Sequence, residues 1–142
     1  MFANSMIDAS MIQAYAETHY RVFGDEPFTL RVGEDSARLA VEHHRRDVTS
    51  SAYVTACNPF SRMLSADDNA ERHAALAVDL EHRGLATVEG IGEHPSNRWL
   101  GEPSFLVFGL DLAAAKVLGS HLEQNAIVWS GADAVPQLIL LR

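Results

Sequence analysis

The feature that most constrains the fold is the alternation of strand-like and helix-like segments between Ser51 and Ser130. The helix predicted over 65–83 begins at Ser65, a good N-cap, and ends before Gly84, which is typical of a helix C-terminus. In chain order the segments are residues 51–57, 65–83, 85–91, 104–110, 112–123 and 125–130. This β-α-β-β-α-β order predicts an α+β fold with a ferredoxin-like core over about residues 51–130, in which two helices cover one face of an antiparallel sheet.

Extensions are predicted on both sides of this core. Residues 9–22 carry Met11, Tyr15, Thr18 and Val22 at helical spacings, residues 27–32 alternate as a strand, and residues 36–46 form a second helix. Residues 137–141 add a C-terminal strand. Because the 142-residue chain contains no repeat or linker, we expect residues 1–142 to form a single domain.

Charge and composition exclude several classes of protein. The chain has 11 basic and 19 acidic side chains, a net charge of -8, so we expect no nucleic-acid binding, which depends on basic side chains that neutralise phosphates. No apolar stretch approaches the roughly 20 residues that span a bilayer, and the first ten residues lack the pattern of a signal peptide. We therefore expect a cytoplasmic protein with no membrane partner.

The sequence predicts neither a metal nor a cofactor. The only cysteine, Cys57, excludes an internal disulfide and a zinc site built from several cysteines. His43 and His44 are adjacent, so on a helix they diverge by about 100°, unlike the four-residue spacing of zinc-binding helices. Gly90 and Gly92 lack the third glycine and the following helix of a dinucleotide-binding motif.

Unusual polar residues gather in connections that the predicted topology places at one end of the sheet. These connections are residues 58–65, 92–103 and 123–125. With the start of the helix over 65–83, they carry the candidate ligand-binding residues Asn58, Ser61, Asn69, Arg72, Trp99, Gln124 and Asn125 and the candidate acid or base Glu102. We expect Asn58, Asn69, Arg72, Glu102 and Gln124 to lie within one pocket-sized volume.

Several of these residues also have a structural interpretation: Asn125 fits a helix end, whereas Gln124 does not have this explanation. Asn58 and Ser61 fit a turn that precedes a helix, as well as a helix N-terminus that holds an anion. Arg72 could pair with a neighbouring acid or with Glu102 rather than with a ligand, and Trp99 could close the edge of the core rather than cover a pocket.

The same residues carry a resemblance to a bacterial family known only as domain of unknown function number 3293. The family pattern A-Y-x-x-T-x-Y, F-x-L-R-x-G, T-A-x-N-P-x-S, N-x-x-R, W-x-x-E-x-S and Q-N-A matches this chain at Ala14 to Tyr20, Phe28 to Gly33, Thr55 to Ser61, Asn69 with Arg72, Trp99 to Ser104 and Gln124 to Ala126. Cys57 stands where a tryptophan is usual in the family. The resemblance implies relatives and shared polar motifs but no activity.

Two functions follow as hypotheses. The first is binding, with or without processing, of a small polar or anionic, nucleotide-like molecule at one end of the sheet; Trp99 would cover the ligand and Glu102 would handle protons. The second is a protein-interaction module, an inhibitor or adaptor, whose polar motifs are structural. A free sheet edge would also allow a homo-oligomer to form.

Overall fold

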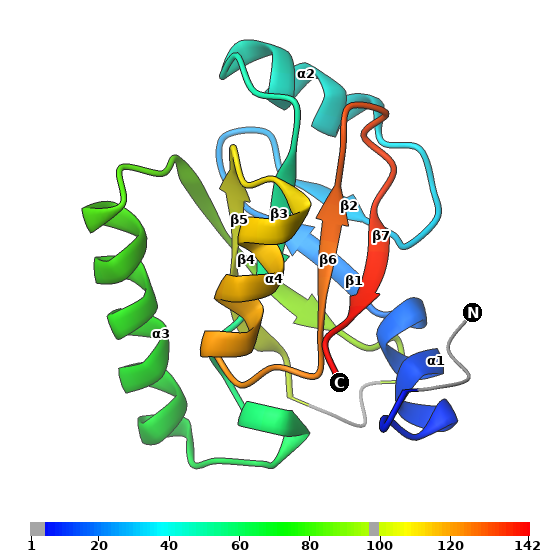
Figure 1. The fold of residues 1–142 in the computed structure, drawn as a ribbon, viewed down its shortest axis with the longest axis vertical. Coiled ribbons are helices and arrows are strands. Elements are labelled where there is room, and N and C mark those ends of the chain that lie inside the picture. Colours follow the sequence, from blue (N-terminus) through cyan, green and yellow to red (C-terminus); the bar gives the residue numbers. More distant parts are fainter. Residues whose placement is uncertain (1–4, 97–99) are drawn as a thin grey trace.

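The computed structural model describes residues 5–96 and 100–142, which form one mixed helix-and-sheet unit (Figure 1). Seven antiparallel strands make a single sheet in the order β2-β1-β4-β5-β3-β6-β7. Their bounds are β1 His19–Val22, β2 Phe28–Leu30, β3 Ser51–Val54, β4 Thr87–Glu93, β5 Glu102–Phe108, β6 Ala126–Ser130 and β7 Gln137–Leu140. The sheet curls into a half-barrel, so it has an inner and an outer face.

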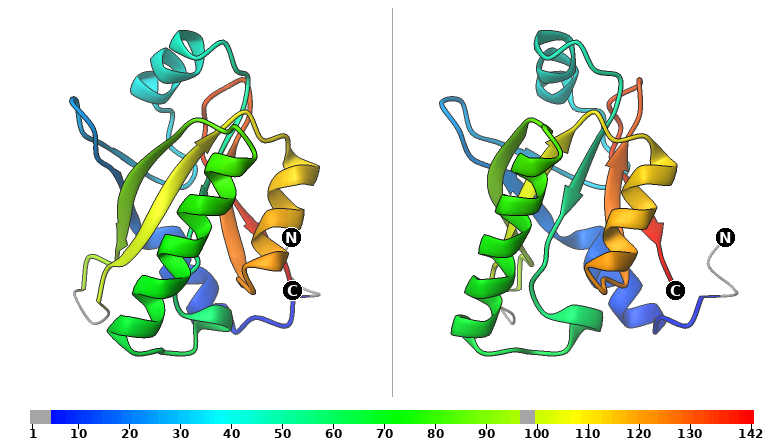
Figure 2. Two further views of the ribbon diagram at one scale, coloured as in Figure 1. Left: turned by 90° about the vertical axis from the view of Figure 1, so that its left-hand side faces the viewer. Right: turned by 60° about the vertical axis from the view of Figure 1, so that its left-hand side comes forward.

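Two helices, α3 (Ala66–His82) and α4 (Leu112–His121), cover the outer face of the sheet (Figure 2). Helix α2 (Ala37–Arg45) lies across one end of the half-barrel, while α1 (Ala9–Glu17) and the short 3₁₀ helix η1 (Pro59–Ser61) lie at the other end. Among the residues that the structure describes, no helix combines the length and the apolar character needed to cross a membrane.

Side-chain caps fix where three of the helices begin. Ser36, Ser65 and Asp111 each accept a hydrogen bond from the backbone N–H three residues later, at 2.8 to 3.1 Å. Gly84 follows α3 with a φ of 70°, which a glycine adopts without steric cost. These positions confirm the predicted limits of α3.

The alternation of side chains along each strand builds two apolar cores. Val54 on β3 faces the outer cluster with Leu76 and Leu80 of α3, whereas Tyr53 faces the inner cluster. The inner cluster contains Val22, Leu30, Leu39, Tyr53, Leu106, Phe108, Val128 and Ala134. Burial of these side chains supplies the main driving force for the fold.

The half-barrel is nearly closed at one end and open at the other. At the α2 end, the Gly33 N–H donates to the Pro136 carbonyl at 2.8 Å and the Ser36 N–H donates to the Ala134 carbonyl at 3.2 Å. These bonds join the segments next to the two edge strands, β2 and β7. No corresponding bond between β2 and β7 is found at the α1 end within the described residues, and the inner face is accessible there.

Close contact between β1 and the centre of the sheet depends on Gly90. The Tyr53 hydroxyl of β3 reaches across the inner face and donates to the Arg21 carbonyl of β1 at 2.7 Å. A Cβ atom at residue 90 would lie 2.0 Å from that carbonyl oxygen and 2.8 Å from the tyrosine hydroxyl. Only a glycine leaves room for this contact.

The prediction of a helix over residues 9–22 is wrong beyond Glu17. The Thr18 backbone is extended, with φ -64° and ψ 143°, and its hydroxyl donates back to the Ala14 carbonyl. Residues 19–22 then form β1, which pairs with both β2 and β4. Tyr15, Thr18 and Val22 satisfy a helical spacing, but pairing with β2 and β4 stabilises an extended backbone at residues 19–22, which that spacing does not reveal.

The expected segments between residues 51 and 130 are present in the expected order, with strand limits shifted by up to three residues. The predicted N-terminal helix, strand and helix are instead a helix, two strands and a helix, so the sheet is larger than predicted. The predicted C-terminal strand is confirmed as β7, which pairs with β6 at the edge of the sheet.

We expect Gly90→Ala to lower the free energy of unfolding by about 3 kcal/mol, because the new methyl group collides with backbone rather than with a flexible side chain. Gly92→Ala is the matched control, since a Cβ there meets nothing closer than 3.8 Å, and we expect a change within about 1 kcal/mol. Urea unfolding of both variants measures the difference. Equal stabilities would show that the curl does not depend on Gly90.

Candidate functional site

A cavity of about 390 Å³ opens on the inner face of the half-barrel at the α1 end. Its volume lies within the range of small-molecule sites. Helix α1, the turn around η1, the inner face of the sheet and the segment before β6 all contribute to its wall. The principal polar lining residues are Tyr15, Thr18, Tyr20, Tyr53, Thr55, Asn58, Ser61, His94, Glu102, Ser104, Gln124 and Asn125.

Apolar side chains complete the wall and the opening. Val128 belongs to the inner apolar cluster and Leu138 packs against it, and both line the cavity. Met63 and Leu100 line the cavity yet are 66% and 81% exposed, which places them at its opening to solvent. The cavity therefore has a polar wall between two apolar regions.

The Asn58 side chain organises the turn after β3. Asn58, Phe60 and Ser61 all have a positive φ, between 47° and 60°, an unfavourable conformation for residues other than glycine. The Asn58 Oδ1 atom accepts from the Leu64 N–H and from Asn69 Nδ2, each at 2.9 Å. Asn69 Oδ1 in return accepts from the Asn58 N–H at 2.9 Å. These bonds stabilise the left-handed backbone and join the turn to the first turn of α3.

Arg72 and Gln124 hold the chain on the far side of this turn. The Arg72 guanidinium donates to the carbonyl oxygens of Ala56 and Leu122 and lies 3.8 Å from the Glu123 carboxylate. Gln124 Nε2 donates to the Cys57 and Leu122 carbonyls at 3.1 and 3.2 Å. Both side chains thus satisfy buried backbone acceptors between β3 and β6.

Glu102 begins β5 and carries the carboxyl group of the cavity. Asn58 Nδ2 donates to Glu102 Oε2 at 2.7 Å, and no other described residue donates to this carboxylate. Burial raises the pKa of Glu102, and the bond from Asn58 opposes that shift only in part. A carboxyl group with this environment and with access to a cavity can accept a hydrogen bond, pair with a cation or exchange a proton.

The hydroxyl groups of the three tyrosines lie in two environments. The Tyr15 hydroxyl contacts the Ser61 hydroxyl, and Asn125 Nδ2 donates to both, at 3.0 and 3.3 Å. Tyr20 and Tyr53 pack edge to face with their centroids 5.3 Å apart. Burial raises the pKa of Tyr20 and of Tyr53, so both remain protonated at neutral pH.

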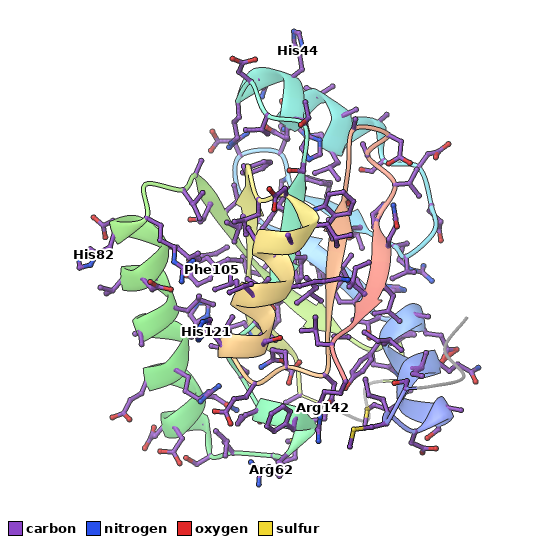
Figure 3. All side chains as sticks on the ribbon, viewed as in Figure 1. His44, Arg62, His82, Phe105, His121 and Arg142 are labelled. Atoms are coloured by element: carbon purple, nitrogen blue, oxygen red, sulfur yellow. The ribbon has the colours of Figure 1, made fainter. Side chains whose placement is uncertain are left out.

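Arg142 contacts Asn125 of this wall but does not line the cavity. Its Nη1 atom donates to Asn125 Oδ1 at 3.1 Å, and its guanidinium lies 4.2 Å from the centre of the Phe60 ring (Figure 3). The bond orients the Asn125 amide, so that the amide NH₂ points toward Tyr15 and Ser61.

The predicted site residues fall into three groups. Asn58, Ser61, Glu102, Gln124 and Asn125 line the cavity. Asn69 and Arg72 do not line it; they support the turn from behind through the contacts described above. Trp99 lies outside the described residues.

Arg72 therefore matches none of the three predicted partners, which were a ligand, a neighbouring acid of α3 and Glu102. Its short backbone contacts arise because α3 passes beside the ends of β3 and α4, a neighbourhood that local spacing does not reveal. No lysine or arginine is among the described residues that line the cavity.

Sequence reasoning missed the contribution of Tyr15, Thr18, Tyr20 and Tyr53 to the cavity. The first three are the A-Y-x-x-T-x-Y motif, whose polar positions were available as a signal. They were overlooked because residues 9–22 were interpreted as one helix that packs through its apolar face. The bend at Thr18 brings the motif onto the cavity from both α1 and β1.

Comparison with known proteins identifies relatives of this chain. Residues 54–127, which are more than half of the chain, match a family described as "Protein of unknown function (DUF3293)". The chain belongs to this family. No curated protein and no solved structure matches. The part that matches DUF3293 contains Asn58, Ser61, Glu102, Gln124 and Asn125, whereas Tyr15 and Tyr20 precede it.

The arrangement offers one carboxylate and many neutral polar groups. Among the described residues there is no group of three or more His, Cys, Asp or Glu side chains that could hold a metal ion.

We expect Glu102→Gln to raise the free energy of unfolding at neutral pH by on the order of 1 kcal/mol. The raised pKa means that the wild type loses stability as pH rises through the folded-state pKa, whereas the glutamine stays neutral and can still accept from Asn58. The gain should vanish below the ordinary pKa of a glutamate. The other ionisable groups that line the cavity are Tyr15, Tyr20, Tyr53 and His94, and the buried Cys57 thiol lies beside Glu102.

Urea unfolding of both proteins between about pH 4 and about pH 8 provides the measurement. Glu71→Gln is the control, because Glu71 is exposed on α3 and does not line the cavity. A destabilised Glu102→Gln variant at neutral pH would mean that the carboxylate is compensated in the folded protein.

Proposed function

We propose that this protein binds a small polar molecule in the cavity at the α1 end of the half-barrel. The observation that carries the proposal is a partly buried carboxyl group, Glu102, with one hydrogen-bond donor and direct access to a cavity of about 390 Å³. Removal of a carboxylate from water disfavours its charged form, and carboxyl groups with a raised pKa are enriched at ligand and catalytic sites.

We prefer a ligand site to a purely structural network because the polar residues differ in what they contact: some bond to backbone groups, whereas Glu102 faces the cavity. Asn69 and Arg72 satisfy backbone groups behind the turn, as purely structural residues would. Gln124 lines the cavity but donates to two backbone carbonyls, whereas Glu102 lines the cavity with a single donor. For a ligand with an exchangeable proton, Glu102 is the residue we assign as acid or base.

An anionic ligand receives less support than a neutral or cationic one. The cation expected to hold it, Arg72, is bound to backbone carbonyls, and the described lining residues include no lysine or arginine. A phosphate beside Glu102 would also repel the carboxylate. A nucleotide-like ligand would therefore enter through its base or sugar rather than its phosphates.

We also propose that β3 to β6 with α3 and α4 form a ferredoxin-like core to which β1, β2 and β7 are added. The order β4-β5-β3-β6 and the antiparallel pairing of these strands support this classification.

The alternative function is a protein-interaction module or a homo-oligomer that uses a sheet edge. The edge strand β7 (Gln137–Leu140) pairs on one side only, with β6, in the sheet as described, which supports this alternative. We expect no nucleic-acid binding from a chain with a net charge of -8.

Two measurements on the purified chain test the ligand proposal. Denaturation followed by mass spectrometry identifies any small molecule carried through purification, and a thermal-shift screen covers nucleosides, amines, alcohols and carboxylates. A compound at about one hundred times its Kd should stabilise the protein by about 2.7 kcal/mol, which raises the melting temperature by several degrees.

Gly92→Leu is designed to fill part of the cavity, because a side chain at residue 92 would lie beside Thr18 and Tyr20 of the cavity wall. We expect it to abolish the stabilisation by ligand, while Glu71→Gln retains it. An empty screen combined with a concentration-dependent dimer in sedimentation velocity would favour the interaction module instead.

A further inference from the structure

Most of the hydroxyl groups that line the cavity donate their protons to the backbone; the exceptions are Tyr15 and Ser61, which bond to each other. Tyr20 donates to the Tyr15 carbonyl, Tyr53 to the Arg21 carbonyl and Thr18 to the Ala14 carbonyl. Thr55 and Ser104 follow the same pattern with the carbonyls of Pro103 and Glu102, each at 2.8 Å. A hydroxyl has one proton and two lone pairs, so these five groups can only accept from a ligand.

The side-chain amides of the wall also donate hydrogen bonds to acceptors within the protein. Asn125 Nδ2 donates to the neighbouring hydroxyls of Tyr15 and Ser61, and Gln124 Nε2 donates to two backbone carbonyls. Asn58 uses one Nδ2 proton on Glu102. The donors of the wall are therefore largely used within the protein, and the acceptors remain.

The charge of the cavity and its aromatic rings also favour a ligand that donates hydrogen bonds and carries a positive charge. The cavity contains the Glu102 carboxylate, no lysine or arginine among its described lining residues, and the rings of Tyr15, Tyr20 and Tyr53. The face of an aromatic ring is electronegative and attracts cations. A donor-rich cation complements every one of these features, whereas an anion or a ligand rich in acceptors opposes them.

We propose that the ligand is an organic cation, a protonated amine on an apolar or aromatic body, whose ammonium group pairs with Glu102 among the tyrosine side chains. The inference rests on the proposed function, since it names the ligand class for the same cavity. The apolar body would lie against Val128 and Leu138, and Met63 and Leu100 at the opening would contact its outer end. Glu102 is the single carboxylate among the described lining residues, and the described part of the chain contains no group of three or more His, Cys, Asp or Glu side chains placed to hold a metal ion, which favours an amine over a metal ion.

Matched compounds that differ in one group provide the test on the wild-type chain. The first set is phenethylamine, phenethyl alcohol and phenylacetate, and the second is hexylamine, hexanol and hexanoate. At about pH 8 the amines are protonated, because their pKa is near that of lysine, about 10.4. In isothermal titration we expect the amine of at least one set to bind about tenfold more tightly than its alcohol, and the carboxylate to bind more weakly still.

The variant Glu102→Gln should reduce the advantage of the amine over its alcohol to about twofold or less, because the charge that pairs with the ammonium is gone. Glu71→Gln should retain the full advantage. Unfolding of Glu102→Gln without ligand verifies that the variant is folded, and the comparison of compounds on the wild type does not depend on it.

An alcohol or carboxylate that binds the wild type as tightly as its amine would overturn the inference and leave the proposed function intact. If no member of either set binds, the wider thermal-shift screen decides. Hits that are only neutral or anionic overturn the inference alone, whereas a screen without any hit overturns the inference together with the proposed function. Amine hits whose stabilisation is lost in Glu102→Gln support both.

Discussion

The side chain of Asn58 is the interaction on which the functional end of this protein depends. One amide group holds Leu64 and Asn69 through its oxygen and Glu102 through its nitrogen, so it links the turn after β3, the start of α3 and the start of β5. It does so from a left-handed backbone conformation that costs free energy. The hydrogen bonds that offset this cost also position the only carboxylate among the described lining residues of the cavity.

The curl of the sheet is the second constraint, because a flat sheet would have no enclosed inner face. Tyr53 reaches the backbone of β1 over Gly90, and the segments beside β2 and β7 join at the α2 end. Closure at that end buries an apolar core, and the opposite end remains open above polar residues. The same curvature therefore produces both the stability of one end and the cavity of the other.

Glu102 connects this architecture to the proposed ligand site. Folding buries its carboxyl group and supplies a single amide donor, which leaves the charged form poorly solvated. Neighbouring hydroxyls cannot relieve it, since their protons are already bound to backbone carbonyls. A bound ligand that donates hydrogen bonds to the Glu102 carboxylate would stabilise its charged form. Without such a ligand, the poorly solvated carboxylate lowers the stability of the folded protein.

The sequence by itself determined the segments that depend on local signals. Caps and glycines fixed α3, and the order of elements from residue 51 to residue 130 followed from periodicity. It also indicated most of the polar residues at the functional end. Tertiary structure alone decided that residues 19–22 form a strand, because this choice depends on pairing with β2 and β4. It also decided that Arg72 supports the backbone while Glu102 faces the cavity, since the partners of both residues lie far away in the chain.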